Sequence, residues 1–374
     1  MNKHTKSILF LPFLQIPSGH HQVANALIDG IRQIDPNIKC DKVDIFSFSY
    51  GNIEKMISFI YLKWIHVFPR LYNSIYKISV YKNIEKNKRY RLYELLFMSF
   101  MKKLIKEKQP DLIICTHALP SYMLNFLKEK NEIQIPVINV YTDYFIHRFW
   151  GIDNIDFHLV PSAEIKKYLV ERGICDKKIF ITGIPIHSKI IKQKQSHIYQ
   201  KKSRVSVLIS GGNLGVGGLE DLLLRIGEMQ SPQQIQFYIL CGKNRKLYER
   251  LKKIQNPNII AFPYISCREK MNDLYDQMDA ILTKPGGVTI SESLFKRKPI
   301  LIYDALPGQE EINLQRLKEA GLIFHLNKEN IYEQLRTILQ DEAGINEYQT
   351  HVENFHSQIH SKEPFEIIAD ILMW

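Results

Sequence analysis

The stretch ILTKPGGVTISESLFKRKPILIYDALPGQEEIN, residues 281–313, decides how we expect the chain to fold. It opens on an apolar run at 279–283 that is typical of a buried strand, breaks at Pro-Gly-Gly, and resumes with helical spacing over 288–295. A second apolar run at 299–303 predicts another buried strand. A strand, a glycine turn and a helix in this order predict a helix N-terminus whose free backbone N–H groups and positive dipole end suit an anion.

Three acidic or amide side chains stand at informative places in this stretch. Glu292 falls in the second turn of the predicted helix, where a carboxylate could accept two hydrogen bonds from a ribose diol. Gln309 and Glu310 follow the second strand in the turn-rich segment 307–311. Taken alone, the pattern also fits an ordinary strand-to-helix turn with solvated acids. The order of several motifs along the chain favours a nucleotide site.

Length and composition predict two domains and no membrane-spanning helix. The chain has 374 residues, 45% of them hydrophobic, which is enough for two cores. It contains no uninterrupted apolar run of about 18 residues. The basic residues 1–7 lead into a short apolar run at 8–16, which is typical of a first strand and not of a signal peptide. The five cysteines are scattered without metal-ligand spacing, which indicates free thiols in a reducing cytoplasm.

Positive charge is concentrated in one part of the chain. The formal net charge is +11, and residues 55–108 carry 13 lysines and arginines against 3 glutamates, with aromatic residues between them. This mixture suits amphipathic helices that bind an anionic membrane surface. It also suits a core-facing aromatic stripe with a solvated basic face, or single-stranded nucleic acid. No nucleic-acid-binding module is recognisable, so we expect no nucleic acid partner.

The first half of the chain reads as strands that end in polar residues. An apolar strand at 7–14 turns at 16–21 into a helical pattern, with His20 at the helix start. Two further strands, 111–117 and 137–143, end at His117 and Asp143. Because the carboxyl ends of parallel strands share one edge of a sheet, we expect these side chains at one rim. The alternatives are a polar turn residue for His20 and a helix N-cap for Asp143.

The second half repeats the alternation of strands and helices. A strand at 205–209 leads into the loop SGGNLGVGG at 210–218, whose five glycines let the backbone approach a phosphate, and a helix is expected at 219–229. The loop is not the G-x-G-x-x-G fingerprint of dinucleotide sites. Later helices are expected at 327–339 and 363–374.

In this order, the motifs resemble those of GT-B glycosyltransferases. Within them the chain is most similar to the branch of plant monogalactosyldiacylglycerol synthases, bacterial processive diacylglycerol glucosyltransferases and the transferase that makes lipid II. The resemblance rests on G-G-x-T-x-x-E at 286–292, the later Gln-Glu pair, S-G-H at 18–20, and T-D-x-x-x-H-x-x-W at 142–150. The chain departs from the family at Ile16 and Pro17, where a glycine is missing, and at His187, where the family often has Arg.

The resemblance implies an α/β fold of the GT-B type, in which two Rossmann-like domains with parallel sheets face each other across a cleft. It implies an N-terminal acceptor and membrane-binding domain at 1–188 and a linker at 189–204. A nucleotide-sugar-binding domain at 205–350 follows. The helical segment at 351–374 is expected to return to the N-terminal domain.

The resemblance also implies site residues. Those expected to bind the nucleotide-sugar are Gly211, Gly212, Asn213, Ile265, Gly286, Gly287, Thr289, Glu292, Gln309 and Glu310. Among them Glu292 is expected to hold the ribose, Ile265 the uracil ring, and the Gln-Glu pair the sugar. His147 and Trp150 are expected on the acceptor side, and either His20 or Asp143 as the catalytic base. The next candidates for the base are His147 and His117.

The implied activity is an inverting transfer of a hexose from a UDP-sugar to a lipid acceptor of the diacylglycerol type. The enzyme would be cytoplasmic and peripheral on the inner face of the cell membrane. No two aspartates are spaced D-x-D, so we expect no metal, and the UDP-sugar needs no further cofactor. Two alternatives share the expected fold, namely a UDP-N-acetylglucosamine 2-epimerase and a non-catalytic nucleotide-sugar-binding protein.

Overall fold

The protein forms two compact units, and each is described by itself. The computed structural model describes residues 5–13, 18–50, 89–195, 202–211, 235–254, 256–327 and 329–373. The first unit comprises Met1–Ser188 and Gln358–Trp374, and the second comprises Lys189–Ser357. Most of the basic stretch 55–108, the predicted helix at 219–229, Gly212 and Asn213 lie outside the described residues.

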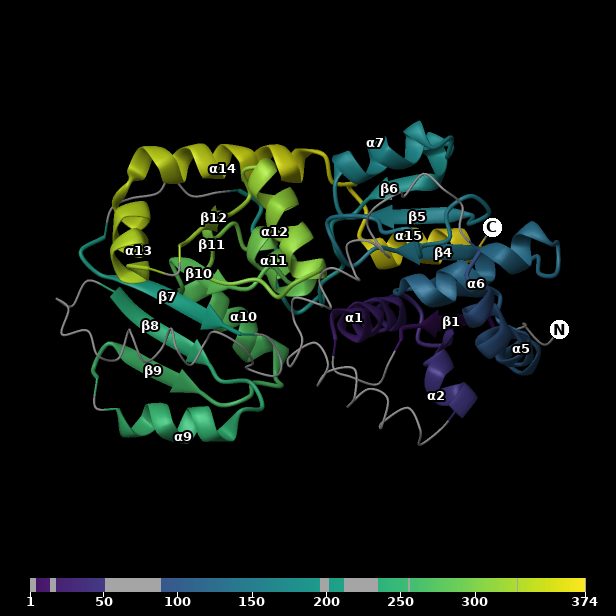
Figure 1. Cartoon of the computed structure of the whole chain (residues 1–374), viewed down its shortest axis with the longest axis horizontal. Helices are drawn as coiled ribbons and strands as arrows, with labels where there is room; N and C mark the ends of the chain where they lie inside the picture. The colour runs from purple at the N-terminus through teal and green to yellow at the C-terminus, as the bar shows by residue number, and fades with distance from the viewer. Residues whose placement is uncertain are drawn as a thin grey trace. The chain divides into compact units, whose positions relative to one another are not determined.

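The first unit is built from alternating strands and helices (Figure 1). In chain order its elements are β1 (Ser7–Leu11), α1 (Gly19–Ile34), β2 (Lys39–Lys42), α2 (Ile45–Tyr50), α5 (Arg91–Lys108), β3 (Leu112–Cys115), α6 (Ala118–Glu129), β4 (Val137–Val140), β5 (Phe157–Val160), α7 (Ala163–Glu171), the 3₁₀ turn Asp176–Lys178, β6 (Ile179–Ile181) and α15 (Pro364–Met373).

The six strands of this unit form one parallel sheet in the order β2-β1-β3-β4-β5-β6. All residues of β3 and β4 are buried, which explains why they read as continuous apolar runs, because a parallel sheet is covered on both faces. After β1 the chain first adds β2 on one side and then β3 on the other. The carboxyl ends of β1 and β3 therefore flank a topological switch point, where ligands bind in open α/β sheets.

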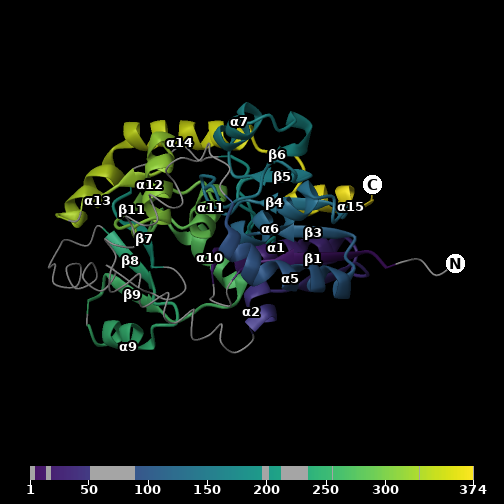
Figure 2. The same cartoon turned by 45° about the vertical axis from the view of Figure 1, so that its right-hand side comes forward.

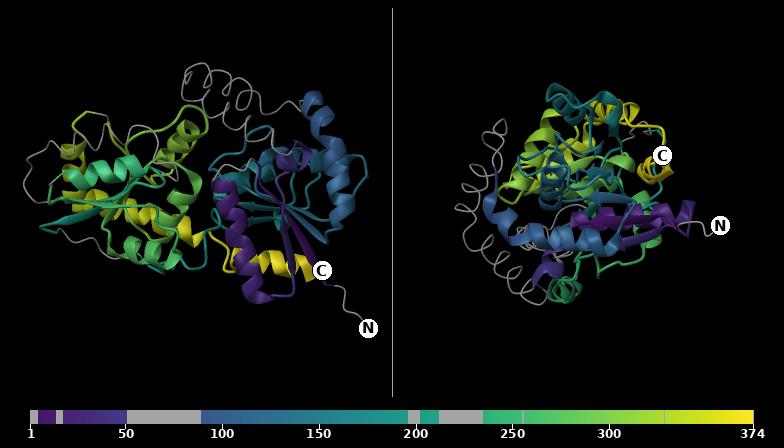
Figure 3. Two further views of the ribbon diagram at one scale, coloured as in Figure 1. Left: turned by 90° about the horizontal axis from the view of Figure 1, so that it is seen from below. Right: turned by 90° about the vertical axis from the view of Figure 1, so that its right-hand side faces the viewer.

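The last helix of the chain, α15, packs against α1 in the first unit, as the left view of Figure 3 shows. A Cβ atom on Gly30 of α1 would lie 2.4 Å from the ring of Phe365. The small residue is therefore what lets the two helices approach this closely. Ile28 and Ile31 of α1 are buried, as are Ile367 and Ile368 of α15.

The second unit has the same kind of architecture (Figures 1 and 2). Its elements are β7 (Val205–Ser210), β8 (Ile235–Leu240), α9 (Arg245–Lys253), β9 (Ile259–Phe262), α10 (Arg268–Gln277), β10 (Ala280–Thr283), α11 (Gly287–Phe295), β11 (Ile300–Ile302), α12 (Gln309–Glu319), β12 (Phe324–His325), α13 (Ile331–Gln340) and α14 (Glu342–Ser357). The expected α/β class is confirmed, with a parallel sheet in each unit.

The second sheet has the strand order β12-β11-β10-β7-β8-β9, and all its pairings are parallel. Its switch point lies between β7 and β10, because β8 and β9 extend the sheet on one side of β7 and β10 on the other. Thr283 at the end of β10 donates its hydroxyl hydrogen to the carbonyl oxygen of Ser210 at the end of β7, at 3.0 Å. This bond fixes the two strand ends at the switch point.

The structure differs from the sequence predictions at several boundaries. Gln309 and Glu310, expected in a turn, occupy the first turn of α12. The helix predicted at 327–339 is present as α13, but α14, which no prediction covered, follows it, and the second unit continues to Ser357. Residues 189–195, expected at the start of a linker, are hydrogen-bonded within the second unit. None of the described helices is both long and apolar enough to cross a bilayer.

Candidate functional site

His20 lies at the switch point of the first sheet, at the start of α1. Its Nδ1 is 2.8 Å from the carbonyl oxygen of Thr116, which follows β3, and 2.9 Å from the hydroxyl oxygen of Thr142, which follows β4. A carbonyl oxygen only accepts hydrogen bonds, so Nδ1 carries the proton in the neutral ring. The lone pair is then on Nε2. This is the tautomer that a base working through Nε2 needs.

Burial and charge act on His20 in opposite directions. Burial lowers the pKa of His20 below its ordinary value of 6.5, while the Asp143 carboxylate and the hydrogen bond to Thr116 raise it. The net shift is downward, so the ring is neutral at neutral pH. Asp143 itself is buried, with 6% of its surface exposed. The structure therefore brings the two predicted base candidates within electrostatic reach of each other.

Two further histidines belong to the same rim. The ring of His117 lies edge-on to that of His20, with centroids 4.8 Å apart, and its Nδ1 accepts the backbone N–H of Leu119 as the N-cap of α6. The Nδ1 of His147 accepts the backbone N–H of Phe149 at 3.3 Å. Burial and the neighbouring His20 lower the pKa of His147 to about 3. His147 is therefore neutral at neutral pH.

Trp150 is almost fully buried and belongs to the wall of a pocket in the first unit. Its ring packs against Tyr141, with centroids 4.6 Å apart, and lies 6.3 Å from the ring of His147. The pocket has a volume of about 370 Å³, and its lining includes Asn125, Phe126 and Asn154 beside the tryptophan. Four cations, Arg89, Lys130, Arg148 and Arg172, and two acids, Glu129 and Asp153, also line it.

In the second unit, α11 begins at a glycine turn that follows β10. Gly286 is its N-cap residue and has no side chain to cap the helix, no described side chain caps it in its place, and its first turn contains no acid. A Cβ atom on Gly286 would meet nothing within 4 Å among the described residues. Gly287 and Thr289 are half-buried in the first turn. Gly211, the one described residue of the three predicted in the glycine-rich loop, follows β7 across the switch point.

Glu292 on α11 is buried, with 7% of its surface exposed. Its Oε2 accepts a hydrogen bond from the hydroxyl of Tyr275 at 2.9 Å, and its Oε1 lies 3.9 Å from Arg268 Nη1. Burial raises the pKa of Glu292, and Arg268 and Tyr275 oppose this shift. Both partners come from α10 and were not predicted from the sequence. They hold the carboxylate in one orientation and leave lone pairs for a ligand.

The remaining predicted donor-site residues lie on the loops and helices around the second sheet. Gln309 and Glu310 are half-buried, and Glu310 Oε2 accepts the backbone N–H of Leu306 at 2.7 Å. Part of the Glu310 carboxylate is thus used to fix the loop before α12. Ile265 is half-buried, and next to it Tyr264 is 47% exposed, with the Lys243 amine 5.7 Å from its ring centroid. An exposed tyrosine in this loop offers a flat apolar face, which the sequence reading did not single out.

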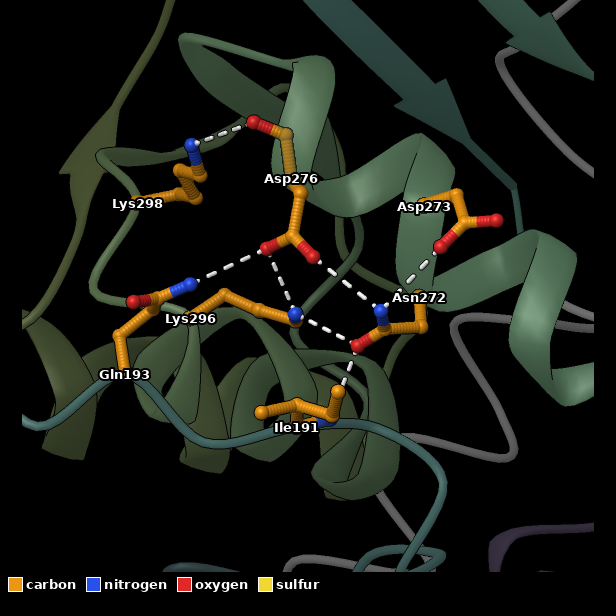
Figure 4. A network of polar contacts seen from close by, with 7 residues as sticks. All are labelled: Ile191, Gln193, Asn272, Asp273, Asp276, Lys296 and Lys298. Carbon is orange, nitrogen blue, oxygen red and sulfur yellow. Dashed lines mark hydrogen bonds and ion pairs between the residues drawn. The ribbon is translucent and has the colours of Figure 1, made fainter.

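Lys296, the C-cap of α11, ties this helix to α10 (Figure 4). Its side chain has no exposed surface, and its amine donates to Asp276 Oδ1 and Asn272 Oδ1, both at 2.6 Å. Asn272 Oδ1 also accepts the backbone N–H of Ile191 at 2.8 Å. Because α10 carries Arg268 and Tyr275, the network fixes the helix that orients Glu292.

The C-terminal end of α11 also contacts the first and the last segments of the second unit. The backbone N–H of Gln193 donates to the carbonyl oxygen of Phe295 at 2.8 Å. The Nε2 of His356, one residue before the last residue of the unit, is 2.8 Å from the carbonyl oxygen of Leu294. Arg297 donates to the carbonyl oxygens of Gln193 and Lys194 and pairs with Glu353. The segments with which this unit begins and ends are therefore both bound to the same end of α11.

Comparison with known proteins identifies the family. A family model of monogalactosyldiacylglycerol (MGDG) synthase matches residues 20–186. The uncharacterized glycosyltransferase YkoN of Bacillus subtilis is 41% identical over 370 residues, which cover 98% of this chain and 97% of that protein. A processive diacylglycerol beta-glucosyltransferase of Bacillus cereus is 30% identical over 364 residues, covering 95% of this chain and 90% of that protein. The chain belongs to this glycosyltransferase family.

A solved structure agrees with the fold expected of this glycosyltransferase family. MurG of Acinetobacter baumannii superimposes with a TM-score of 0.59 at 13% sequence identity, covering 98% of this chain and 99% of that one. At this identity the similarity concerns the fold alone, and it confirms the predicted GT-B class. The resemblance inferred from the motifs is thus confirmed at the level of the family and of the fold.

Proposed function

We propose that this glycosyltransferase moves a hexose from a UDP-sugar to a hydroxyl group of a diacylglycerol-type lipid, with inversion at the anomeric carbon. The observation that carries the proposal is the pairing of His20 with Thr116 at the switch point of the first sheet. Because Nδ1 is hydrogen-bonded to this carbonyl oxygen, the lone pair of the neutral ring is on Nε2 and is available to accept a proton. The related Bacillus enzyme is named for transfer to diacylglycerol, which supports the acceptor class.

In the proposed reaction His20 acts as the base. Nε2 takes the proton of the acceptor hydroxyl while that oxygen forms a bond to the anomeric carbon. The bond between this carbon and the β-phosphate oxygen breaks, and UDP leaves with the electron pair. Asp143, whose carboxylate favours the charged ring, stabilises the imidazolium that forms. In this assignment Asp143 acts through His20, and the alternative is that Asp143 takes the proton itself.

The second unit is proposed to bind the donor. Glu292, held by Tyr275 and Arg268, accepts hydrogen bonds from the ribose diol. The diphosphate lies at the open N-terminus of α11, where backbone N–H groups and the helix dipole meet its charge. Gln309 and Glu310 bind the sugar, and Ile265 packs on the uracil ring. Gly211 and the glycines that follow it complete the phosphate site, and we propose no cofactor.

We further propose that the protein binds the anionic inner face of the cell membrane through the first unit. Within the described part of the basic stretch, α5 exposes three apolar or aromatic side chains: Leu95 at 80%, Leu96 at 38% and Tyr93 at 36%. Arg91, Lys102 and Lys103 lie on the same helix and are also exposed. Apolar side chains beside cations suit the interface of an anionic bilayer.

Lipid analysis after incubation tests the proposed activity. The protein is incubated with diacylglycerol vesicles and, in separate reactions, UDP-glucose, UDP-galactose or UDP-N-acetylglucosamine, and the lipids are separated by thin-layer chromatography. We expect a glycolipid from one donor, and about 10²–10⁴-fold slower formation of it with His20→Ala. Conversion of UDP-N-acetylglucosamine to its 2-epimer without lipid would show the epimerase alternative. UDP binding without any product would show the non-catalytic one.

A further inference from the structure

Lys284 is a buried cation whose amine forms no hydrogen bond with any described residue. It follows β10 directly, and only 6% of its surface is exposed. Its nearest charged partner is Asp304, with Nζ 3.7 Å from Oδ2, beyond the usual length of a hydrogen bond. Burial of an ammonium group without hydrogen bonds is costly, since water would satisfy all three of its donors. The described residues therefore supply no hydrogen-bond partner for this amine, which leaves its three donors available to a ligand.

The surroundings of Lys284 are those of an anion site. The residue directly follows a strand at the switch point of the second sheet and comes three positions before the first residue of α11. The turn between them is fixed, because Gly286 N–H donates to the Lys284 carbonyl at 2.8 Å and Asn313 Nδ2 donates to the Pro285 carbonyl at 3.2 Å. Among the residues that the structure describes, no side chain caps the helix N-terminus and no atom lies within 4 Å of a Cβ placed on Gly286. A fixed turn thus joins a buried cation to free backbone N–H groups.

We propose that Lys284 binds the diphosphate of the nucleotide-sugar donor, with its amine on a phosphate oxygen that the α11 N-terminus also approaches. The inference rests on the proposed function and adds to it a residue to which neither the motif nor the family resemblance assigned a role. A lysine amine is a compact charge with rotatable donors, which suits a phosphate oxygen. The same contact stabilises the charge that grows on the phosphate as UDP leaves.

Asp304 is the resting counter-ion of Lys284 in this proposal. A carboxylate so close to the phosphate site repels the ligand, so its contribution to donor binding is neutral or unfavourable. If the ion pair of Lys284 and Asp304 only stabilised the fold, replacement of either side chain would change UDP affinity in the same direction. If Lys284 binds the phosphate, UDP affinity should fall when Lys284 is replaced, and it should stay the same or rise when Asp304 is replaced. This difference separates a ligand contact from a structural ion pair.

The experiment compares the binding of UDP and uridine by calorimetry to the parent, Lys284→Met, Asp304→Asn and the double variant with both changes. The double variant removes both charges, so it leaves no uncompensated buried charge and keeps the test open if Lys284→Met does not fold. Lys298→Met, at the other end of α11, is the matched control. Uridine, which has the ribose but no phosphate, reports whether the nucleoside site is intact.

We expect Lys284→Met and the double variant to lose UDP affinity by roughly 10- to 100-fold, the scale of a hydrogen bond to a charged group, with uridine affinity unchanged. Asp304→Asn and Lys298→Met should bind UDP at least as well as the parent. A double variant that binds both ligands like the parent overturns the inference. A parent that does not prefer UDP to uridine overturns the proposed donor site instead, and the inference with it.

Discussion

The Nδ1 atom of His20 lies 2.8 Å from the carbonyl oxygen of Thr116, and this contact decides which nitrogen of the ring is available for chemistry. The bonded nitrogen keeps its proton, and the other keeps its lone pair. The contact joins a residue after β1 to one after β3, across the switch point of the sheet. The sequence does not indicate which tautomer His20 adopts. The strand order explains it, because it places the carbonyl oxygen of Thr116 next to Nδ1.

We predict that His20→Ala and Asp143→Asn each lower transfer by about 10²–10⁴-fold, the usual contribution of general base catalysis, while UDP affinity is unchanged. If the two residues act as a unit, the double variant will be little slower than the slower single variant. Turnover and UDP binding are measured on the same preparations, with the exposed His325→Ala as the control. Parent turnover in both single variants would place the base elsewhere, with His147 or His117 next.

The pH dependence of transfer follows from the lowered pKa of His20. Because burial keeps the ring neutral, its base form persists below the ordinary pKa of 6.5, and the rate should fall only when the pH drops below the lowered value. Removal of the Asp143 charge lowers the pKa of His20 further. In Asp143→Asn the residual activity should therefore fall at a more acidic pH than in the parent, and an acid limb that moves toward neutral pH would contradict this.

Glu292→Ala should weaken UDP binding by about 1.5–3 kcal/mol, the range for hydrogen bonds to a charged group. Tyr275→Phe should have a smaller effect in the same direction, because it removes the hydroxyl that orients the carboxylate and leaves the carboxylate in place. Calorimetry with UDP measures both changes, and a thermal melt shows that each variant is folded. Unchanged affinity in a folded Glu292→Ala protein would exclude the ribose role.

Binding to vesicles should depend on anionic lipid, on salt and on the exposed face of α5. Replacement of Leu95 and Leu96 by serine removes apolar surface and should weaken binding to vesicles of phosphatidylglycerol in phosphatidylcholine. Val170→Ser on α7, where the side chain is also exposed, is the matched control. Binding should fall as salt rises, because exposed charges are screened. Equal binding to neutral vesicles at low salt would argue against the anionic partner.

Lys296→Met should destabilise the second unit by about 1–2 kcal/mol, because it removes two hydrogen bonds of a fully buried amine, while the carboxylate of Asp276 is 38% exposed and remains solvated. The double variant with Asp276→Asn should lose less than the sum of the two single losses, because the two side chains share one interaction. Chemical denaturation measures the free energy of unfolding. Lys298→Met removes one hydrogen bond to the Asp276 carbonyl and serves as the control. Equal losses of stability for the two lysine variants would show that the two hydrogen bonds of the buried Lys296 amine add nothing to the stability of the unit.

The parts of the fold that the sequence predicted share a physical reason. The strands β3, β4 and β10 are buried along their whole length, so they stand out as apolar runs between glycine and polar breaks. The start of α12 was predicted to be a turn because Pro307 and Gly308 are typical turn residues. Glu310 and Glu311 are equally typical of the first turn of a helix, and the structure has a helix there.

The parts of the candidate site that the sequence missed are contacts between separate elements. Tyr275 and Arg268 reach Glu292 from another helix, and nothing in their local sequence marks them. Lys284 was visible next to the glycine pair, but only its burial without a hydrogen bond distinguishes it from an ordinary loop lysine. Spacing predicts which residues share a rim, whereas the partner of each side chain depends on packing.

The attachment of residues 191–194 to the end of α11 has a practical consequence for protein engineering. A fragment that starts at 205, as the sequence alone suggests, lacks residues 191–194. These residues form hydrogen bonds with Asn272, Arg297 and the carbonyl oxygen of Phe295. The fragment would expose these polar groups and the face of Phe295 on which Lys192 lies, 4.2 Å from the ring centroid. A fragment of the second unit for crystallisation or ligand screening should therefore begin at Lys189 and end at Ser357.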